Sequence, residues 1–334
     1  MQNRGKRENQ HYVPQLLLRN FSFKGNGKVP QVHVFDKKDE KTFQTGVNNV
    51  LAEGRFYDLT KYSAEASFSK LESSLEPILT KIITERDISS LTDDEKVWVS
   101  VFVMAQYLRV KSFRTDAQEM LQGIVEKFGK IPDFTDKLSN SNEDVKDFSL
   151  KFIQENLSEM SGYILNKDWY ILETKESSPF WIGDNPVTLH NENKSELYGN
   201  IGFGVQGIQI YLPLSSTLTL MFWCPSIKAE LEGLLEKYSK MLNDFMVQQV
   251  MENKALYEQR GSINSLQKLM DDTKKIVEAI KLGKPKLASK ENVEFYNSLQ
   301  VYYAERYILS NKCEFSLAES MIKDGAGTKK WTFS

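Results

Sequence analysis

Apolar side chains dominate the stretch Val97–Arg109, VWVSVFVMAQYLR, and leave no continuous polar face for solvent. A helix that is apolar all round, yet too short to cross a bilayer, is typical of a protein core. The sequence Thr92-Asp93-Asp94-Glu95 just before it is a capping box, which signals a helix N-terminus. We therefore predict a buried central helix over about residues 92–128, around which the rest of the chain packs.

Two periodicities describe the rest of the chain. Helical spacing of apolar residues predicts further helices at residues 64–86, 145–165, 227–257 and 293–309, the first of them interrupted by Pro77. Apolar runs bounded by turn residues predict short strands at residues 32–36, 169–172, 179–182, 187–190, 208–212 and 218–223. The lysine-rich interval 281–290, which contains Gly283 and Pro285, is predicted to be an exposed linker.

These elements predict an α+β fold, with a helical body around the central helix and an antiparallel sheet of about five or six strands. We expect a single compact domain over residues 1–334. A division into two lobes is the alternative: a mainly helical N-terminal lobe (1–131), and a lobe of sheet plus C-terminal helices (148–334). The boundary would then be the stretch 132–147, which is rich in Asp, Ser and Asn.

Composition narrows the class of protein. The 43 basic and 45 acidic residues nearly cancel, so no global field favours nucleic acid or a membrane surface. The two cysteines, Cys224 and Cys313, have no metal-ligand spacing and suggest a reducing compartment. The polar N-terminus lacks a secretory signal, and no apolar run reaches the roughly 20 residues of a membrane helix. We predict a cytoplasmic protein that does not contact membranes.

The glycine-rich stretch 202–207 and the three histidines could each belong to a functional motif. Gly202-x-Gly204-x-x-Gly207 has the letters of a dinucleotide fingerprint, but a predicted strand follows it where that motif needs a helix. We therefore predict no dinucleotide cofactor. The three histidines, His11, His33 and His190, are scattered and form no zinc motif. For His11, an acid–base role and an ordinary structural role are equally open.

Gln106 and Arg109 lie one turn apart on the central helix, where a buried guanidinium must meet something acidic. In the structural interpretation, Arg109 bridges Glu72 or Asp184 and thereby joins two elements. In the functional interpretation, its fork of donors holds a carboxylate or phosphate ligand.

Gly183-Asp184-Asn185-Pro186 follows a predicted buried strand. All four residues favour turns, so a plain turn is the simpler interpretation. A carboxylate at the end of a buried strand is also how many sites place an acid or a metal ligand.

The segment His11-Tyr12-Val13-Pro14-Gln15, with Leu18-Arg19-Asn20-Phe21 after it, resembles the start of the domain of unknown function 4238 family of bacterial proteins. Gln106-x-x-Arg109 with Arg114, the Asp184-Asn185-Pro186 turn, and Asn297 through Ala304 to Arg306 resemble the same family in the same order. One departure is Gly183, where the family more often has Ser. The family carries no known activity, but the resemblance implies that His11, Gln106, Arg109 and Asp184 recur as one set that converges in space.

Two functional hypotheses remain. The first is an intracellular bacterial hydrolase, a phosphodiesterase or nuclease acting on RNA or a nucleotide, in phage defence or toxicity. His11, Glu72 and Asp184 would be catalytic, Gln106, Arg109 and Asn185 would bind substrate, and a divalent metal stays open. The second is a non-catalytic module, in which the same residues form a structural network. A ligand or partner would then bind elsewhere, for example at the glycine loop 199–207. The oligomeric state stays open in both.

Overall fold

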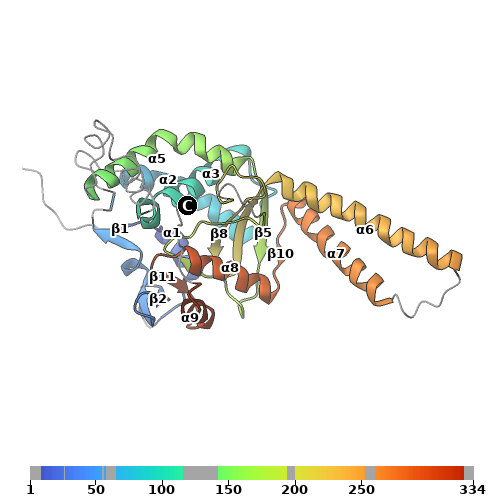
Figure 1. Cartoon of the computed structure of the whole chain (residues 1–334). Coiled ribbons are helices and arrows are strands. Elements are labelled where there is room, and N and C mark those ends of the chain that lie inside the picture. The colour runs from blue at the N-terminus through green and yellow to red at the C-terminus, as the bar shows by residue number, and fades with distance from the viewer. Residues whose placement is uncertain are drawn as a thin grey trace, which may run out of the picture.

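A computed structural model describes residues 9–25, 27–54, 56–57, 65–115, 142–193, 200–252 and 260–326 (Figure 1). The N-terminal segment (residues 9–21) begins with β1 (Asn9–His11), which pairs antiparallel with β4 (Ala52–Gly54). The helical turn α1 (Gln15–Leu18) starts directly after Pro14, and the 3-10 turn η1 (Arg19–Phe21) continues it. Pro14 suits this place because its fixed φ matches a helix start and no N–H is lost.

The central helix is α3 (Asp93–Leu108), and the capping box at Thr92 and Glu95 is confirmed. The helix ends at Leu108, and residues 111–115 are helical again after a break at Arg109 and Val110. The predicted continuous run past Leu108 is therefore wrong at this break, and residues 116–128 lie outside the described residues. The start of the helix also faces solvent, with Val97 42% and Trp98 39% exposed, so the mainly buried part begins only at Val99. α2 (Glu65–Glu85), which continues through Pro77, and α5 (Asn142–Leu165) pack against it.

A five-stranded sheet has the order β10-β5-β9-β8-β7. Its strands are β10 (Lys286–Leu287), β5 (Asp168–Glu173), β9 (Leu218–Trp223), β8 (Gln209–Ser215) and β7 (Thr188–His190). All neighbours are antiparallel except β10 and β5. Alternate residues point to opposite faces. Ile171 and Leu220 therefore join the helical core of α2, α3 and α5, whereas Tyr170 and Trp223 join a second core on the other face. Both faces are buried, which explains why these strands are continuously apolar.

A four-stranded sheet has the order β3-β2-β11-β6 and gathers segments from the whole chain. Its strands are β3 (Lys41–Gly46), β2 (Gln31–Asp36), β11 (Tyr307–Ser310) and β6 (Ile182–Gly183), and the 3-10 turn η2 (Val47–Asn49) follows β3. The predicted helix 293–309 is wrong at its end. α8 (Lys290–Tyr303) stops before Ala304, and residues 307–309 belong to β11. Pairing with β2 on one side and β6 on the other overrides the helical spacing there.

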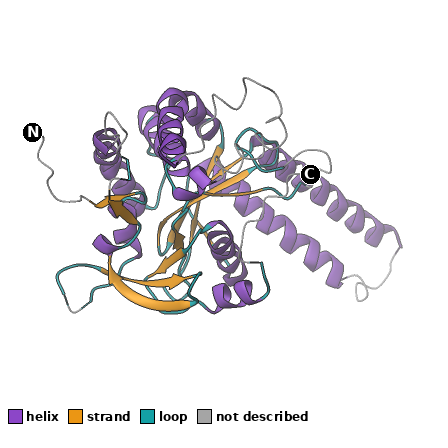
Figure 2. Cartoon of the chain, turned by 60° about the vertical axis from the view of Figure 1, so that its left-hand side comes forward, coloured by secondary structure: helices purple, strands orange, loops and turns teal. Residues whose placement is uncertain are grey.

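Two long helices, α6 (Pro225–Glu252) and α7 (Arg260–Leu282), lie side by side and project from the body as a hairpin (Figures 1 and 2). The prediction of a linker at residues 281–290 is wrong, because β10 lies within it and extends the five-stranded sheet. A short helix, α9 (Ser316–Lys323), follows β11. None of the described helices combines the length and apolar character that crossing a bilayer requires.

Candidate functional site

A cavity of about 350 Å³ lies between the N-terminal segment and one face of α2; we call it the α2 cavity. Five residues of α2 line it at spacings of three and four, which places them on a single helix face. They are Glu65, Ser69, Glu72, Ser73 and Glu76. The N-terminal segment contributes Asn9, His11, Gln15, Leu16 and Arg19, and Tyr57 completes the lining.

His11 ends β1 and stands on the wall of the α2 cavity. Its Nε2 lies 3.0 Å from the side-chain nitrogen of Gln15, whereas its Nδ1 is buried and has no hydrogen-bond partner among the described residues. A substrate in the cavity would therefore have to reach Nε2. Burial lowers the pKa of His11, the backbone of Val50 acts in the opposite direction, and the charge of Arg109 lowers it further. The imidazole is consequently neutral at neutral pH, the form in which it accepts a proton.

Arg109 lies behind this cavity rather than in it, and its side chain has no exposed surface. Its Nη1 donates to Glu72 Oε1 over 2.7 Å, while Nε and Nη2 donate to Gln106 Oε1 over 2.9 and 2.6 Å. The guanidinium also sits over the rings of Phe68 and Phe102, at 5.3 and 5.8 Å from their centroids. This geometry is that of the structural interpretation, with Glu72 rather than Asp184 as the acidic partner.

Gln106 extends the network to the N-terminal segment. Its Nε2 donates to the backbone carbonyl of Tyr12 over 2.9 Å, and Tyr12 follows His11 directly. The chain from Glu72 through Arg109 and Gln106 therefore ties α2 and α3 to the residue beside His11.

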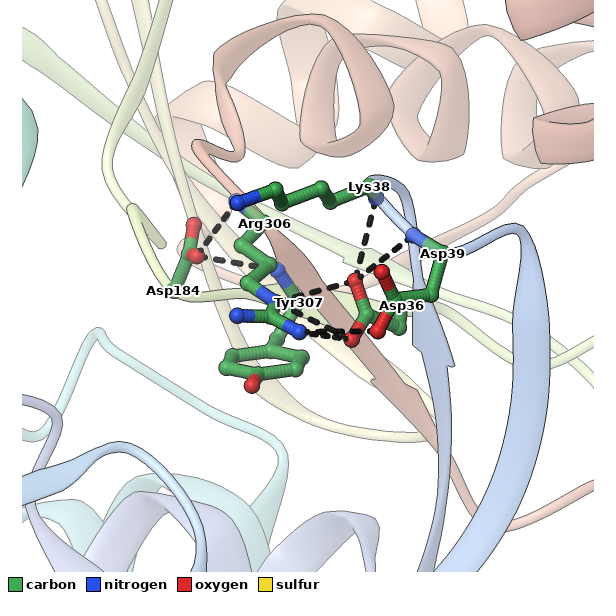
Figure 3. Close-up of polar contacts among 6 residues, drawn as sticks. All are labelled: Asp36, Lys38, Asp39, Asp184, Arg306 and Tyr307. Carbon is green, nitrogen blue, oxygen red and sulfur yellow. Dashed lines mark hydrogen bonds and ion pairs between the residues drawn. The ribbon is translucent and has the colours of Figure 1, made fainter.

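Asp184 lies at a different place, in the turn after β6. Its carboxylate accepts three hydrogen bonds from the backbone N–H groups of Glu305, Arg306 and Tyr307, over 2.8, 2.7 and 2.9 Å. Figure 3 shows Asp184 beside Arg306 and Tyr307. Burial raises the pKa of Asp184 despite these donors, which act in the opposite direction. The carboxylate thus holds the connection between α8 and β11, a role that a turn residue can fill without any ligand.

A second cavity, of about 590 Å³, borders Asp184, and we call it the Asp184 cavity. Its lining includes Tyr12, Lys111, Glu53 and Arg306 but neither His11 nor Arg109. Asn185 also points elsewhere, because its Nδ2 donates to Ser112 Oγ over 2.8 Å. Of the two acidic partners that the sequence offered for Arg109, Asp184 is therefore not the one in contact with it.

The structure therefore divides the predicted site residues. His11 and Glu72 share the α2 cavity, and Gln106 and Arg109 support Glu72 from behind. Asp184 and Asn185 belong to the turn beside β11. Sequence reasoning missed Gln15, Arg19 and Tyr57 as lining residues. For Gln15 and Arg19 the sequence held a signal, because they follow His11 at intervals of four residues. In the structure Arg19 donates a hydrogen bond to Gln15 over 3.3 Å.

No group of three His, Cys, Asp or Glu side chains within the described residues is placed to hold a metal ion. Among families of known proteins, the one described as protein of unknown function (DUF4238) matches residues 9–314. No curated protein and no solved structure shows significant similarity to the chain.

Proposed function

This chain belongs to the DUF4238 family, and we propose that it is a cytoplasmic hydrolase in which His11 is the general acid–base group. The observation that carries the proposal is the position of His11. A neutral imidazole stands on the wall of an open polar cavity, and its Nε2 contacts the side-chain amide of Gln15. Such a group suits the role of a general base at neutral pH, because the neutral imidazole can accept a proton there.

The neighbouring residues suggest how the reaction would proceed. His11 Nε2 would take a proton from an attacking water and return it to the leaving group, after the Gln15 amide has moved aside. Glu72 shares the cavity and keeps its orientation through Arg109, which makes Arg109 a positioning residue. Asp184, the other carboxylate that the sequence suggested as catalytic, has no part in this reaction, because its oxygens are occupied by backbone N–H groups.

For the substrate we propose a phosphodiester of RNA or of a nucleotide. Arg19 is the one cation among the described residues that line the α2 cavity, and it would contact a phosphate oxygen. Besides Glu72, which pairs with Arg109, the carboxylates Glu65 and Glu76 line the same cavity and would repel the anion. We therefore propose that a divalent cation enters together with the substrate and shields this repulsion.

The test is hydrolysis of bis(4-nitrophenyl) phosphate and of a fluorescent RNA, with and without Mg²⁺. We expect His11→Asn to lower kcat by about 10²- to 10⁴-fold, the usual contribution of one acid–base group, while the melting temperature stays near that of wild type. The matched control is His33→Asn, since His33 stacks on Phe23 and does not line the α2 cavity. Full activity in His11→Asn would refute the catalytic role, and wild-type protein that cleaves neither substrate would refute the substrate class.

The sealed network around Arg109 favours a second candidate, a non-catalytic module in which these residues only join the N-terminal segment to α2 and α3. A cellular assay for growth arrest or phage resistance separates the two. A folded His11→Asn variant loses the cellular effect if the protein is a hydrolase and keeps it if the network is only structural.

A further inference from the structure

A third cavity, of about 480 Å³, opens where the α6–α7 hairpin leaves the body, and we call it the hairpin-base cavity. The second face of the five-stranded sheet, α8 and the first turns of α6 supply lining residues. Figure 1 shows how these elements are arranged. The segment after β7 and Gly207, the last glycine of the loop before β8, also line it. This cavity is separate from the α2 cavity, and ligand binding in it does not depend on the proposed hydrolysis.

Aromatic rings from three elements form the walls. Tyr170 of β5 and Trp223 of β9 lie side by side with ring centroids 5.1 Å apart, and both are buried. From α8, Phe295 and Tyr296 face the same space, with centroids 5.3 Å apart, and Phe295 is 36% exposed. Flat apolar rings of this kind suit a flat ligand, because every aromatic ring offers a face for stacking.

Side-chain amides supply the polar part of the lining. Asn193, Gln209 and Asn292 all border the cavity, and no described residue accepts a hydrogen bond from their NH₂ groups. Two of these amides are held in place through their oxygens. The Gln209 oxygen accepts from the Tyr211 hydroxyl, and the Asn292 oxygen accepts from Ser289 Oγ over 3.1 Å. Such amides can read the edge of a heterocycle through directed hydrogen bonds.

Gly207 shows that the backbone is shaped around this polar edge. It adopts φ of 79°, and a Cβ there would lie 2.5 Å from Asn193 Nδ2. Only glycine lets the amide of Asn193 approach so closely without strain. The glycine loop, which is not a dinucleotide motif, thus has a role in forming the cavity.

The charges on the lining select against anionic ligands. Glu192 and Glu230 carry two negative charges, and Lys286 is the single cation among the described lining residues. A nucleoside triphosphate would meet net repulsion, whereas an uncharged ring would not.

We propose that the hairpin-base cavity binds a planar nitrogen heterocycle, the base of an uncharged nucleoside. The volume lies within the range of about 300–1,000 Å³ that small-molecule sites occupy. The base stacks among the aromatic rings, and the three amides contact its edge. The bound ligand also touches Ile227 and Leu231 of α6, so that binding couples to the base of the hairpin.

The experiment is titration calorimetry of the full chain with adenosine, guanosine and, as a small organic cation, choline. We expect one of the nucleosides to bind and choline to bind at least tenfold more weakly. Hydrogen exchange with that nucleoside should slow at residues 225–234, while residues 93–108 of α3, which do not line the cavity, stay unchanged. Absence of nucleoside binding at millimolar concentration, or tighter binding of choline, would overturn the proposal.

Variants test the site itself. Phe295→Ala should weaken nucleoside binding about tenfold, since one stacking partner is lost. The Phe295 side chain is partly exposed, so we expect the variant to fold normally. The matched control is Phe43→Ala, a similarly exposed phenylalanine on β3, which should bind like wild type. Glu192→Gln should leave nucleoside affinity within twofold. A large loss in Glu192→Gln would indicate a cationic ligand, and equal binding by Phe295→Ala and wild type would contradict stacking in this cavity.

Discussion

Two buried ionisable side chains, Arg109 and Asp184, are surrounded by hydrogen-bond partners. Arg109 has all three of its donor nitrogens in hydrogen bonds and lies between aromatic rings, and Asp184 receives three backbone N–H groups. Each would be costly to bury without partners. The partners differ, however, because Arg109 joins side chains of two helices, whereas Asp184 holds a backbone turn. Only the first arrangement borders the cavity that contains His11.

Arg109→Met should destabilise the protein by about 2–4 kcal/mol, because Gln106 and Glu72 lose their buried partner. The figure lies somewhat below that of a fully buried pair, since the Glu72 side chain keeps 27% exposure and can be partly solvated. Urea denaturation at neutral pH measures it.

The control for this experiment is Arg86→Met, which breaks the half-exposed pair with Glu173 and should cost about 1 kcal/mol or less. If Arg109→Met costs no more than this control, Arg109 does not act as a structural residue and instead waits for an anionic ligand.

At the scale of the element, α3 combines a strong local start signal with a buried part that begins only at Val99. The capping box at Thr92 is complete in sequence and in structure. From Val99 onward the helix packs between α2 and α5, and Phe102 is fully buried. Val97 and Trp98 fit the apolar pattern of the sequence, but in the structure both side chains remain partly exposed to solvent.

Phe102→Ala should cost about 3–5 kcal/mol in a denaturant melt, through the cavity that it leaves in a dense core. Trp98→Ala removes a larger ring from the same helix, but its exposure predicts a loss of roughly 0.5 kcal/mol or less. Similar losses for both variants would mean that the two faces of α3 are equally buried.

At the scale of the whole molecule, the four-stranded sheet holds distant parts of the chain together. β2 comes from the N-terminal part of the chain, and its neighbour β11 comes from the C-terminal part. Beside this pairing, the carboxylate of Asp36 accepts hydrogen bonds from Nε and Nη2 of Arg306 over 2.7–3.0 Å (Figure 3). Lys37 donates to the carbonyls of Val301 and Ala304 at the end of α8. The polar contacts therefore reinforce the closure that the strand pairing makes.

Asp36→Asn should cost about 2 kcal/mol at neutral pH, the usual value for hydrogen bonds to a charged group. Burial alone would raise the pKa of Asp36, but Arg306 and the backbone N–H groups of Lys38 and Asp39 lower it below its ordinary value. A carboxylate with a lowered pKa stabilises the fold fully above the pH of its unfolded titration, at about 4. That stability is lost as the pH falls through the folded pKa.

Thermal melts between pH 7 and pH 3 should therefore show the difference between wild type and Asp36→Asn shrink below about pH 4. Asp39→Asn is the matched control, because Asp39 also contacts Arg306 but is half-exposed, and it should have little effect. A difference that stays constant down to pH 3 would show that the charge of Asp36 is not the stabilising feature.

Local sequence alone determined the α+β class, the helix α2, the start of α3 and most strands of the five-stranded sheet. Periods of two and of 3.6 residues, together with caps and turn residues, are properties of neighbouring positions and can be read without partners. Membership of the DUF4238 family could also be recognised from motifs that recur in order along the chain.

Tertiary structure alone decided which residues meet. Arg109 had two acidic candidates in the sequence, Glu72 and Asp184, and the packing of α2 against α3 selected Glu72. Residues 307–309 became a strand only because β2 and β6 lie on either side of them. The α2 cavity and the hairpin-base cavity likewise form between elements far apart in the chain. Such pairings depend on distances between residues that are far apart in the chain, and no local pattern encodes these distances. The local sequence therefore predicts the elements, whereas the tertiary structure determines which elements pack or pair with each other.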